Sequence, residues 1–376
     1  MYLCNKSKKL KKNTKDTIIP FLQREWLFSL AFIGFFGSCF YTQQIASFDI
    51  KEFEVLWILF TLFVVVNGFK KHNLLVAIAR RIEQGRLIPF KLVFTTFFLA
   101  TFVTNDVSLI VMVPLTLTLR VSQKGLLVIL EVLAANAGSA LTPIGNPQNL
   151  YLYWYYNIPL DIFFKTIAPF SLFFLFILLG VSFFLKQSKK LQPKKLKISL
   201  NSKVYVYFVL FVLIVLIIVH LLPLAFLAVV PLYVVTFDRD VLKVDYFLLL
   251  SFLLFFGIAD NLQTLLATQI QHSHQTFLLS VFASQILSNV PTTLLFANFT
   301  EHYKALLWGV NVGGFGTLFG SLANLIAYKL YVYNKSMKEV MKFTLLFHVM
   351  SFLALFLAIG LYYFVTNYQR NIIFFN

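Results

Sequence analysis

Two stretches of this chain repeat one polar pattern inside sequence that is otherwise apolar. Residues 138–153 read GSALTPIGNPQNLYLY and residues 313–328 read GGFGTLFGSLANLIAY, and both contain G-x3-T-x2-G-x3-N-L-x2-Y without a gap. The matched residues are Gly138 and Gly313, Thr142 and Thr317, Gly145 and Gly320, Asn149 and Asn324, Leu150 and Leu325, and Tyr153 and Tyr328. An ungapped match of this kind predicts that the chain consists of two related halves.

The composition places both halves in a lipid environment. Of the 376 residues, 59% are hydrophobic and 12% are charged, whereas a soluble domain needs roughly twice that charged fraction to cover its surface. Apolar spans of crossing length are predicted near 26–42, 52–68, 161–185, 204–221, 223–237, 245–258 and 343–365. Two further spans, 125–156 and 304–331, contain the repeated pattern and are predicted to be broken transmembrane helices. The sequence therefore predicts an all-α polytopic membrane protein.

Two other apolar stretches, 89–119 and 276–300, each have a polar tip at their centre. The tips are Thr104–Asp106 and Ser288–Asn289. Each arm has about 10–15 residues, which gives roughly 15–22 Å of helix. Because the hydrocarbon core is about 30 Å thick, neither arm crosses it. Both stretches are predicted to be re-entrant hairpins.

The distribution of Lys and Arg predicts the orientation. The formal net charge is +17, and basic residues concentrate in 1–24, 69–88 and 186–203, whereas 259–275 contains no Lys or Arg. Basic loops stay in the cytoplasm, so we expect a multi-pass plasma-membrane protein with a cytoplasmic N-terminus and an external C-terminus. The 45 Phe lie in apolar spans, and we interpret the charge as a solvated cytoplasmic face rather than a nucleic-acid interface.

A fold of two inverted repeats is predicted from this orientation. Segments 69–88 and 259–275 each precede a hairpin and are predicted to be amphipathic interfacial helices, one internal and one external. A pseudo-two-fold axis in the membrane plane relates halves arranged in this way. The predicted units are a basic cytoplasmic tail (1–24), a first inverted repeat (25–185), a cytoplasmic loop and linking helix (186–222), a second inverted repeat (223–365) and an external C-terminal tail (366–376).

The residue types in the broken helices predict a binding site. Pro143, Gly145 and Pro147 cannot sustain a regular helix, so backbone groups near the middle of the membrane lose their helical partners. Free carbonyls with Asn and Thr oxygens suit a hard cation, and helix N-termini that point inward suit an anion. The structural alternative is that Asn, Thr and Ser only satisfy the broken backbone. Four such elements in two inverted pairs favour transport.

Acidic and basic residues narrow the chemistry. Asp106 is the acidic residue at a hairpin tip, which makes it a candidate cation ligand or proton carrier, or alternatively an N-cap of the returning arm 107–119. Glu131 is interpreted as facing the interface or a lysine. Neither hairpin core and neither T-x2-G-x3-N element contains Lys or Arg. A charged anion would therefore be held by helix dipoles, amides, hydroxyls and bound cations, unless the substrate is weakly charged or neutral.

These residues resemble those of the ion transporter superfamily, which includes divalent-anion/sodium symporters, citrate transporter-like carriers, and the arsenite permease and sodium/proton antiporter branch. The stretches TNDVSLIVMVPL, GSALTPIGNPQNLYLY, SNVPTTLLFA and GTLFGSLANLI are similar to family hallmarks. The resemblance covers nearly the whole chain beyond the basic tail. It implies a mobile transport domain of hairpins and broken helices, which moves as an elevator against a homodimeric scaffold, with the Gly145 and Gly320 loops completing two cation sites.

The hairpin tips show where this chain departs from the symporter branch. In that branch each tip carries Ser-Asn-Thr, which binds substrate carboxylate and sodium. Asn105 and Asn289 match the asparagine, and the residues before them, Thr and Ser, match the first position. The third position is Asp106 in one half and Val290 in the other, so the Asn-Asp tip is more similar to the arsenite permease branch.

The sequence predicts a secondary active transporter of a small anion, an inorganic oxyanion or a carboxylate, coupled to sodium or protons and with no other cofactor. The alternatives are arsenite efflux or sodium/proton antiport, and a polytopic membrane enzyme, which would need a His, Asp, Glu or Cys cluster at one depth. The expected partners are the anion and the lipid bilayer. Candidate substrate-binding residues are Thr104, Asn105, Asp106, Thr142, Pro143, Ser288, Asn289, Thr292 and Thr317. Candidate cation-binding residues, with sodium possible at each, are Asn105, Asp106, Gly145, Asn146, Asn149, Asn289, Gly320, Ser321 and Asn324.

Overall fold

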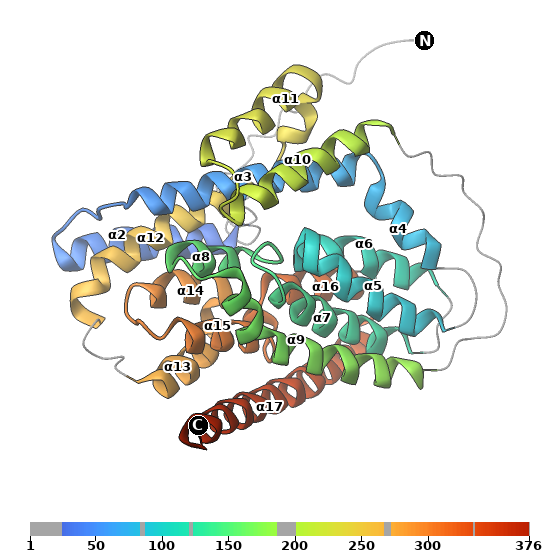
Figure 1. The fold of residues 1–376 in the computed structure, drawn as a ribbon. Helices are drawn as coiled ribbons and strands as arrows, with labels where there is room; N and C mark the ends of the chain where they lie inside the picture. The colour runs from blue at the N-terminus through green and yellow to red at the C-terminus, as the bar shows by residue number, and fades with distance from the viewer. Residues whose placement is uncertain are drawn as a thin grey trace, which may run out of the picture.

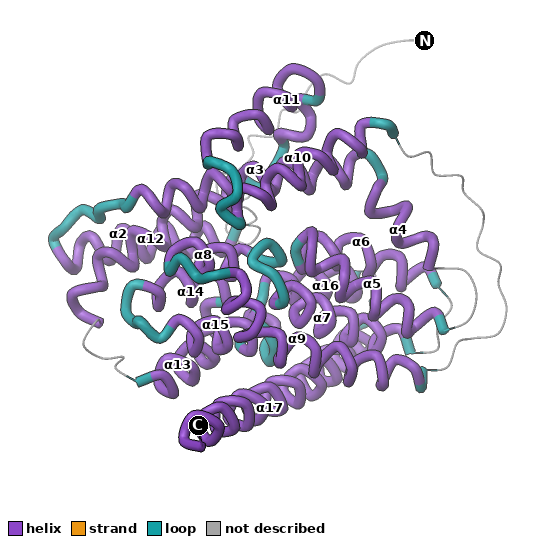
Figure 2. The backbone as a smooth tube through the Cα atoms, viewed as in Figure 1, coloured by secondary structure: helices purple, strands orange, loops and turns teal. Residues whose placement is uncertain are grey.

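The structure is a computed structural model that describes residues 25–82, 87–119, 123–185, 201–266, 272–333 and 335–375. These residues form helices joined by loops and contain no strand (Figure 2). This agrees with the predicted all-α fold. The predicted tail 1–24 and most of the loop 186–203 lie outside the described residues, and the boundaries of the two repeats stay predictions.

One group of helices surrounds the long helix α3 (Ile50–Lys71). Helix α10 (Lys203–Ile218) packs along α3, and α2 (Trp26–Thr42) packs along α12 (Tyr246–Leu266) (Figure 1). Between α10 and α12 the chain forms η1 (Leu224–Ala228), α11 (Val229–Phe237) and η2 (Arg239–Leu242). We call α2, α3, α10, α11 and α12 the scaffold helices.

A second group contains two hairpins and two interrupted helices, which we call the core helices. The hairpins are α5 (Ile88–Val103) with α6 (Asn105–Thr118), and α13 (Ser273–Leu287) with α14 (Asn289–Ala297). The interrupted helices are α7 (Lys124–Ala140) with α8 (Pro147–Tyr155), and α15 (Tyr303–Val312) with η3 (Leu318–Gly320) and α16 (Leu322–Val332). Helices α9 (Leu160–Phe183) and α17 (Met337–Phe375) pack against this group, and α17 runs along one edge of the molecule (Figure 1).

Two segments differ from the sequence predictions. The stretch 223–237, predicted to be one full span, is divided into η1 and the nine-residue α11. Pro231 lies in the first turn of α11 and has no N–H to donate, which favours a short start in the 3-10 conformation. The stretch 259–266, predicted to begin a separate interfacial helix, continues α12 instead. Its counterpart α4 (Leu74–Ile82) does form directly after α3.

Helix lengths limit which elements can cross a bilayer alone. Four helices among the described residues are long and apolar enough by length and composition, namely Ile50–Lys71, Leu160–Phe183, Arg239–Leu262 and Met337–Tyr368. Helix α10 has 16 residues and spans about 24 Å, somewhat less than the hydrocarbon core of about 30 Å. The hairpin arms are of similar or shorter length.

The outer faces of several helices carry large exposed apolar side chains. Phe176 on α9, Phe208 on α10, and Phe356 and Phe364 on α17 are each more than half exposed. A soluble protein rarely exposes so many large apolar groups. This surface suits contact with lipid rather than water.

A buried carboxylate joins three scaffold elements near the end of α3. Asp238, which follows α11, accepts hydrogen bonds from Lys71 Nζ (2.5 Å), His72 Nε2 (2.6 Å) and Tyr207 OH (2.9 Å). Burial acts to raise the pKa of Asp238, but these hydrogen bonds outweigh it and lower the pKa to about 2. The cluster fixes the loop after α11 against α3 and α10.

Replacing Asp238 by asparagine should lower the stability of the protein by about 2 kcal/mol at pH 7, because charge-assisted bonds to a buried carboxylate are lost. A lowered pKa means that this contribution is present above the ordinary value of 3.8 and is lost as the pH falls toward about 2. The melting temperatures of wild type and Asp238→Asn in detergent should therefore differ at pH 7 and converge over that window. Asp161→Asn, which removes an exposed pair with Lys165, is the control and should change little.

Candidate functional site

Each hairpin turns at a single strained residue. Thr104 has φ 80° and ψ 150°, and Ser288 has φ 79° and ψ 156°. This backbone region is almost restricted to glycine and costs about 1–3 kcal/mol for other residues. The carbonyls of both residues accept the first helical bonds of the returning arms, from Ser108 N and Thr292 N. Helices α6 and α14 therefore begin directly at the two tips.

The breaks in the two interrupted helices depend on glycines that approach backbone atoms. A Cβ on Gly145 would lie 2.7 Å from Ser139 Cα and 2.8 Å from its carbonyl carbon. A Cβ on Gly320 would lie 2.7 Å from Gly313 O and 2.9 Å from Phe315 O. Because such distances are shorter than contact allows, only glycine fits at these two positions of the repeated pattern.

Two asparagines satisfy the carbonyls that the breaks release. Asn149 Nδ2 donates to the carbonyls of Ala140 (3.0 Å) and Thr142 (3.4 Å), and Asn324 Nδ2 donates to those of Gly314 (3.0 Å) and Thr317 (3.0 Å). Both asparagines are fully buried. The carbonyls that the sequence offers as cation ligands are therefore already hydrogen-bonded here.

The same two asparagines are joined to the opposite half of the chain. Asn136 Nδ2 on α7 donates to Asn324 Oδ1 (2.8 Å), and Asn311 Nδ2 on α15 donates to Asn149 Oδ1 (2.8 Å). Asn136 and Asn311 occupy equivalent positions, two residues before the matched glycines of the repeated pattern. Each half thus supplies the donor in one bond and the acceptor in the other. We call these two bonds the crossing pairs.

Threonines of the repeated pattern tie each break to its hairpin. Thr142 Oγ1 donates to the carbonyl of Thr101 (2.6 Å), four residues before Asn105. Thr317 Oγ1 donates to the carbonyl of Gln285 (2.8 Å), four residues before Asn289. The two bonds hold the hairpin tips beside the breaks.

Four helix N-termini meet around a small cavity. Its lining comes from the residues at the start of α6, α8, α14 and α16 and from the scaffold helices α2 and α12. The lining residues are Leu27, Asn105, Asp106, Pro147, Gln148, Leu248, Phe252, Ser288, Asn289, Val290, Ser321 and Leu322. None of these residues is basic. Asn146 and Ser321 cap α8 and α16, accepting from Asn149 N (2.9 Å) and Ala323 N (3.3 Å). Helix N-termini carry partial positive charge, so the cavity favours an anion.

Much of this chain's sequence is similar to that of known proteins. The sequence profile of the citrate transporter family matches residues 25–305. The chain belongs to the citrate transporter family. Uncharacterized transporter MJ0456 of Methanocaldococcus jannaschii is 34% identical over 294 residues, which cover 75% of this chain and 82% of that protein. Inner membrane protein YbiR of Escherichia coli is 34% identical over 272 residues, which cover 67% of this chain and 71% of that protein.

This family assignment confirms the resemblance to the ion transporter superfamily and makes the protein a membrane transporter. The cavity of the transporter is small, about 20 Å³, which is enough for one water-sized group. An anion as large as citrate does not fit without movement of the surrounding helices. The described conformation is therefore closed around its candidate site.

Asp106 is the acidic residue of the cavity. It is already the second residue of α6, and the structure gives its side chain no bond to a backbone amide, which leaves the predicted N-cap role unsupported. Its Oδ1 atom is out of contact with solvent and has no hydrogen-bond partner. An ionised carboxylate oxygen left in this state is costly, so a bound cation or a proton would stabilise it.

A wider vestibule of about 240 Å³ adjoins the cavity and shares Asp106, Pro147, Leu248 and Leu322 with it. Thr104 lines the vestibule rather than the cavity. The vestibule also contains Lys70, Lys243 and Asp245 of the scaffold. It therefore separates the scaffold helices from the core helices on the side that the sequence predicts to be cytoplasmic.

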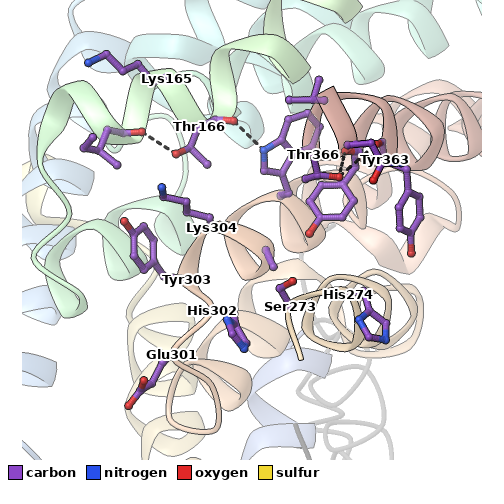
Figure 3. Close-up of a pocket in the computed structure, with 16 residues that line it drawn as sticks. Lys165, Thr166, Ser273, His274, Glu301, His302, Tyr303, Lys304, Tyr363 and Thr366 are labelled. Atoms are coloured by element: carbon purple, nitrogen blue, oxygen red, sulfur yellow. Dashed lines mark hydrogen bonds between the residues drawn. The ribbon is translucent and has the colours of Figure 1, made fainter. Parts of the chain in front are cut away.

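A larger cavity, of about 690 Å³, lies apart from the candidate site (Figure 3). Lys165 and Thr166 of α9 and Tyr303 and Lys304 of α15 contribute to its wall (Figure 3). Trp308, which also lines the cavity, donates from Nε1 to the carbonyl of Thr166 (2.7 Å). None of the predicted site residues lines this cavity. A large volume alone does not make this cavity the candidate binding site, which is formed by the hairpin tips and the helix breaks.

The predicted site residues fall into two sets. Those that line the cavity or the vestibule are Thr104, Asn105, Asp106, Ser288, Asn289 and Ser321. Those that form the frame behind the cavity are Thr142, Pro143, Gly145, Asn146, Asn149, Thr292, Thr317, Gly320 and Asn324. In this frame Thr292 Oγ1 donates to the carbonyl of Ser288 within α14 (2.8 Å).

The sequence predictions missed several residues that form the candidate site. Asn136 and Asn311 could have been found by extending the repeated pattern two residues toward its N-terminus. Gln148 also lines the cavity, and its position directly after Pro147 in an apolar stretch was a usable signal. The apolar wall from α2 and α12 carries no signal, because its residues resemble every other lipid- or core-facing side chain.

Proposed function

We propose that this transporter is a secondary carrier that moves a small anion, an inorganic oxyanion or a carboxylate, coupled to sodium or protons. The observation that carries the proposal is the cavity where α6, α8, α14 and α16 begin, with Asp106 on its wall. The helix N-termini attract an anion, and the unpartnered oxygen of Asp106 requires a positive charge. Anion and cation then each improve the binding of the other, which is the basis of coupled transport.

Two inverted repeats and an elevator-like movement are part of this proposal. The crossing pairs support the first, because reciprocal contacts between equivalent residues are what a two-fold relation produces. The vestibule between scaffold and core supports the second, because it provides an interface along which the core helices can slide. In this proposal the vestibule opens to the cytoplasm, the C-terminus is external, and the scaffold forms a homodimer in the plasma membrane.

Arsenite efflux or sodium/proton exchange is the second candidate function. The tip residue Asp106 favours it, since a carboxylate without a basic neighbour in the cavity can exchange a proton for a cation. The small closed cavity also suits a neutral or monovalent species better than a tricarboxylate.

The test is transport by the purified protein in proteoliposomes. Radiolabelled citrate, succinate, sulfate, phosphate and arsenite are offered separately under an imposed sodium gradient, an imposed proton gradient, or neither. The proposal expects gradient-driven accumulation of an anion above the level of protein-free liposomes. Sodium or arsenite movement against protons, with no accumulation of any anion, would favour the second candidate instead.

A further inference from the structure

A second buried carboxyl group lies in the core helices, away from the cavity. Glu131, in the middle of α7, has no exposed surface. Thr116 Oγ1 of α6 donates to its Oε1 atom (2.5 Å), whereas Oε2 has no hydrogen-bond partner. The interpretation that Glu131 faces the interface or a lysine is wrong, because the side chain is buried and none of the ion pairs between described residues includes it.

The charged groups on the helices packed against α7 leave Glu131 without a partner of opposite charge. Among the described side chains, the acidic and basic ones on these helices are Lys91 on α5, Asp106 on α6, Asp161 and Lys165 on α9, Lys304 on α15, Lys329 on α16, and Lys338, Glu339, Lys342 and His348 on α17, and the tyrosines are Tyr303, Tyr328, Tyr331, Tyr362, Tyr363 and Tyr368. Lys124, at the start of α7, donates to the carbonyl of Leu117 (2.6 Å). A carboxylate in these surroundings would be neither solvated nor paired, whereas a neutral carboxylic acid needs no counter-charge.

We propose that Glu131 is the site where this transporter binds its coupling proton. The proposal rests on the proposed function, since it names the ion and its position for an ion-coupled carrier. In the described conformation the carboxyl group holds the proton and contacts Thr116. The proton site is then separate from the anion cavity, and Asp106 stays beside the substrate.

The helix that covers Glu131 is built to move. Pro114 lies inside α6, two residues before Thr116, and its missing N–H removes one helical hydrogen bond and allows a bend there. The last turn of α6 is held to α7 by the Thr116–Glu131 and Lys124–Leu117 bonds. A bend at Pro114 would break the first bond and admit water, and the proton would pass from the carboxyl oxygen to a water molecule, leaving a carboxylate.

The same two helices connect Glu131 with the cavity. Helix α6 begins at Asn105, and α7 carries Asn136, whose Oδ1 accepts from Asn105 Nδ2 (3.0 Å). Glu131 lies about 7.5 Å along the helix axis from Asn136, a little more than one turn. Displacement of α6 on anion binding therefore acts on the contact that covers the proton site.

Infrared difference spectroscopy of the purified full-length protein tests the proton directly. At pH 7 the spectrum of the wild type minus that of Glu131→Gln should show the carbonyl stretch of one protonated carboxylic acid, because a band from Asp106 is present in both proteins and cancels. Glu339→Gln, which changes an exposed glutamate on α17, should retain the band. Glu131→Asp keeps an acid at this position and should keep a shifted band, even if Glu131→Gln folds poorly. A wild-type minus Glu131→Gln spectrum without this band would overturn the proposal.

Flux measurements test the coupling. In proteoliposomes Glu131→Gln should still exchange labelled for unlabelled citrate, succinate, sulfate, phosphate or arsenite, whichever the wild type carries. It should lose the accumulation that a proton gradient drives. Accumulation equal to that of the wild type under the same gradient would overturn the proposal. If the wild type carries none of these probes, the proposed function fails, while the infrared band still decides whether Glu131 holds a proton.

Discussion

Replacing Gly145 by alanine should abolish transport. The added Cβ would lie 2.7 Å from Ser139 Cα and 2.8 Å from the Ser139 carbonyl carbon, both backbone atoms in the last turn of α7. Backbone cannot rotate aside as the end of a side chain can, so the break between α7 and α8 must open, at a cost of about 3 kcal/mol. The opening moves the N-terminus of α8 away from the cavity. Anion uptake into proteoliposomes should fall to the level of protein-free liposomes.

The chain provides a matched control for this glycine. Gly180, inside α9, has no atom within 4 Å of a built Cβ, and alanine is favoured over glycine in a helix by about 1 kcal/mol. Gly180→Ala should therefore transport normally and melt at the same or a higher temperature. Gly320→Ala, the equivalent change in the second half, should behave like Gly145→Ala. Normal uptake by Gly145→Ala would show that the break does not position the site.

Replacing Asn105 and Asn289 together by alanine should lower anion flux by about 100-fold, which corresponds to about 2.7 kcal/mol at the rate-limiting step. Asn105 Nδ2 donates to Asn136 Oδ1 (3.0 Å), and its own Oδ1 accepts from Asp106 N (3.0 Å). A Cβ built on Gly314 would lie 3.3 Å from Asn289 Nδ2, which places Asn289 beside the second break. Buried groups left without their partner cost about 1–3 kcal/mol each. Initial rates of uptake at several substrate concentrations measure the loss.

Asn298→Ala is the control for the double variant, because Asn298 lies at the far end of α14 from the tip. It should leave the initial rate unchanged. Equal melting temperatures of the three proteins would assign the loss of flux to the site rather than to unfolding. Full flux in the double variant would remove the hairpin tips from the binding site.

The hairpin tips and the helix breaks could be predicted from the sequence, because their polar and helix-breaking residues lie inside apolar stretches. A polar triplet or a Gly-Pro run inside an apolar stretch cannot face lipid without backbone partners, so it predicts a turn or a break at that depth. The structure turns at Thr104 and Ser288 and interrupts the helices after Ala140 and Val312. These positions follow from local chemistry alone.

The hydrogen-bond partners of the individual side chains could not be predicted from the sequence in the same way. Thr142 and Thr317 stay predicted substrate ligands, and the structure adds that their hydroxyls donate to hairpin carbonyls. Asn149 and Asn324 stay predicted cation ligands, and the structure adds that their amides satisfy the breaks. Which partner an amide or hydroxyl finds depends on how distant helices pack, and residue type does not encode this. Pattern alone also did not indicate that Glu131 would be covered by α6.

The crossing pairs constrain how the sequence of this protein can evolve. Each bond joins an amide donor in one half of the chain to an amide oxygen in the other half, with both groups buried. A substitution at Asn136 leaves Asn324 Oδ1 without its donor, and only a matching change far along the sequence can restore the bond. Positions 136 and 324, and likewise 149 and 311, should therefore covary among relatives. Although the two halves repeat one pattern, they cannot diverge independently.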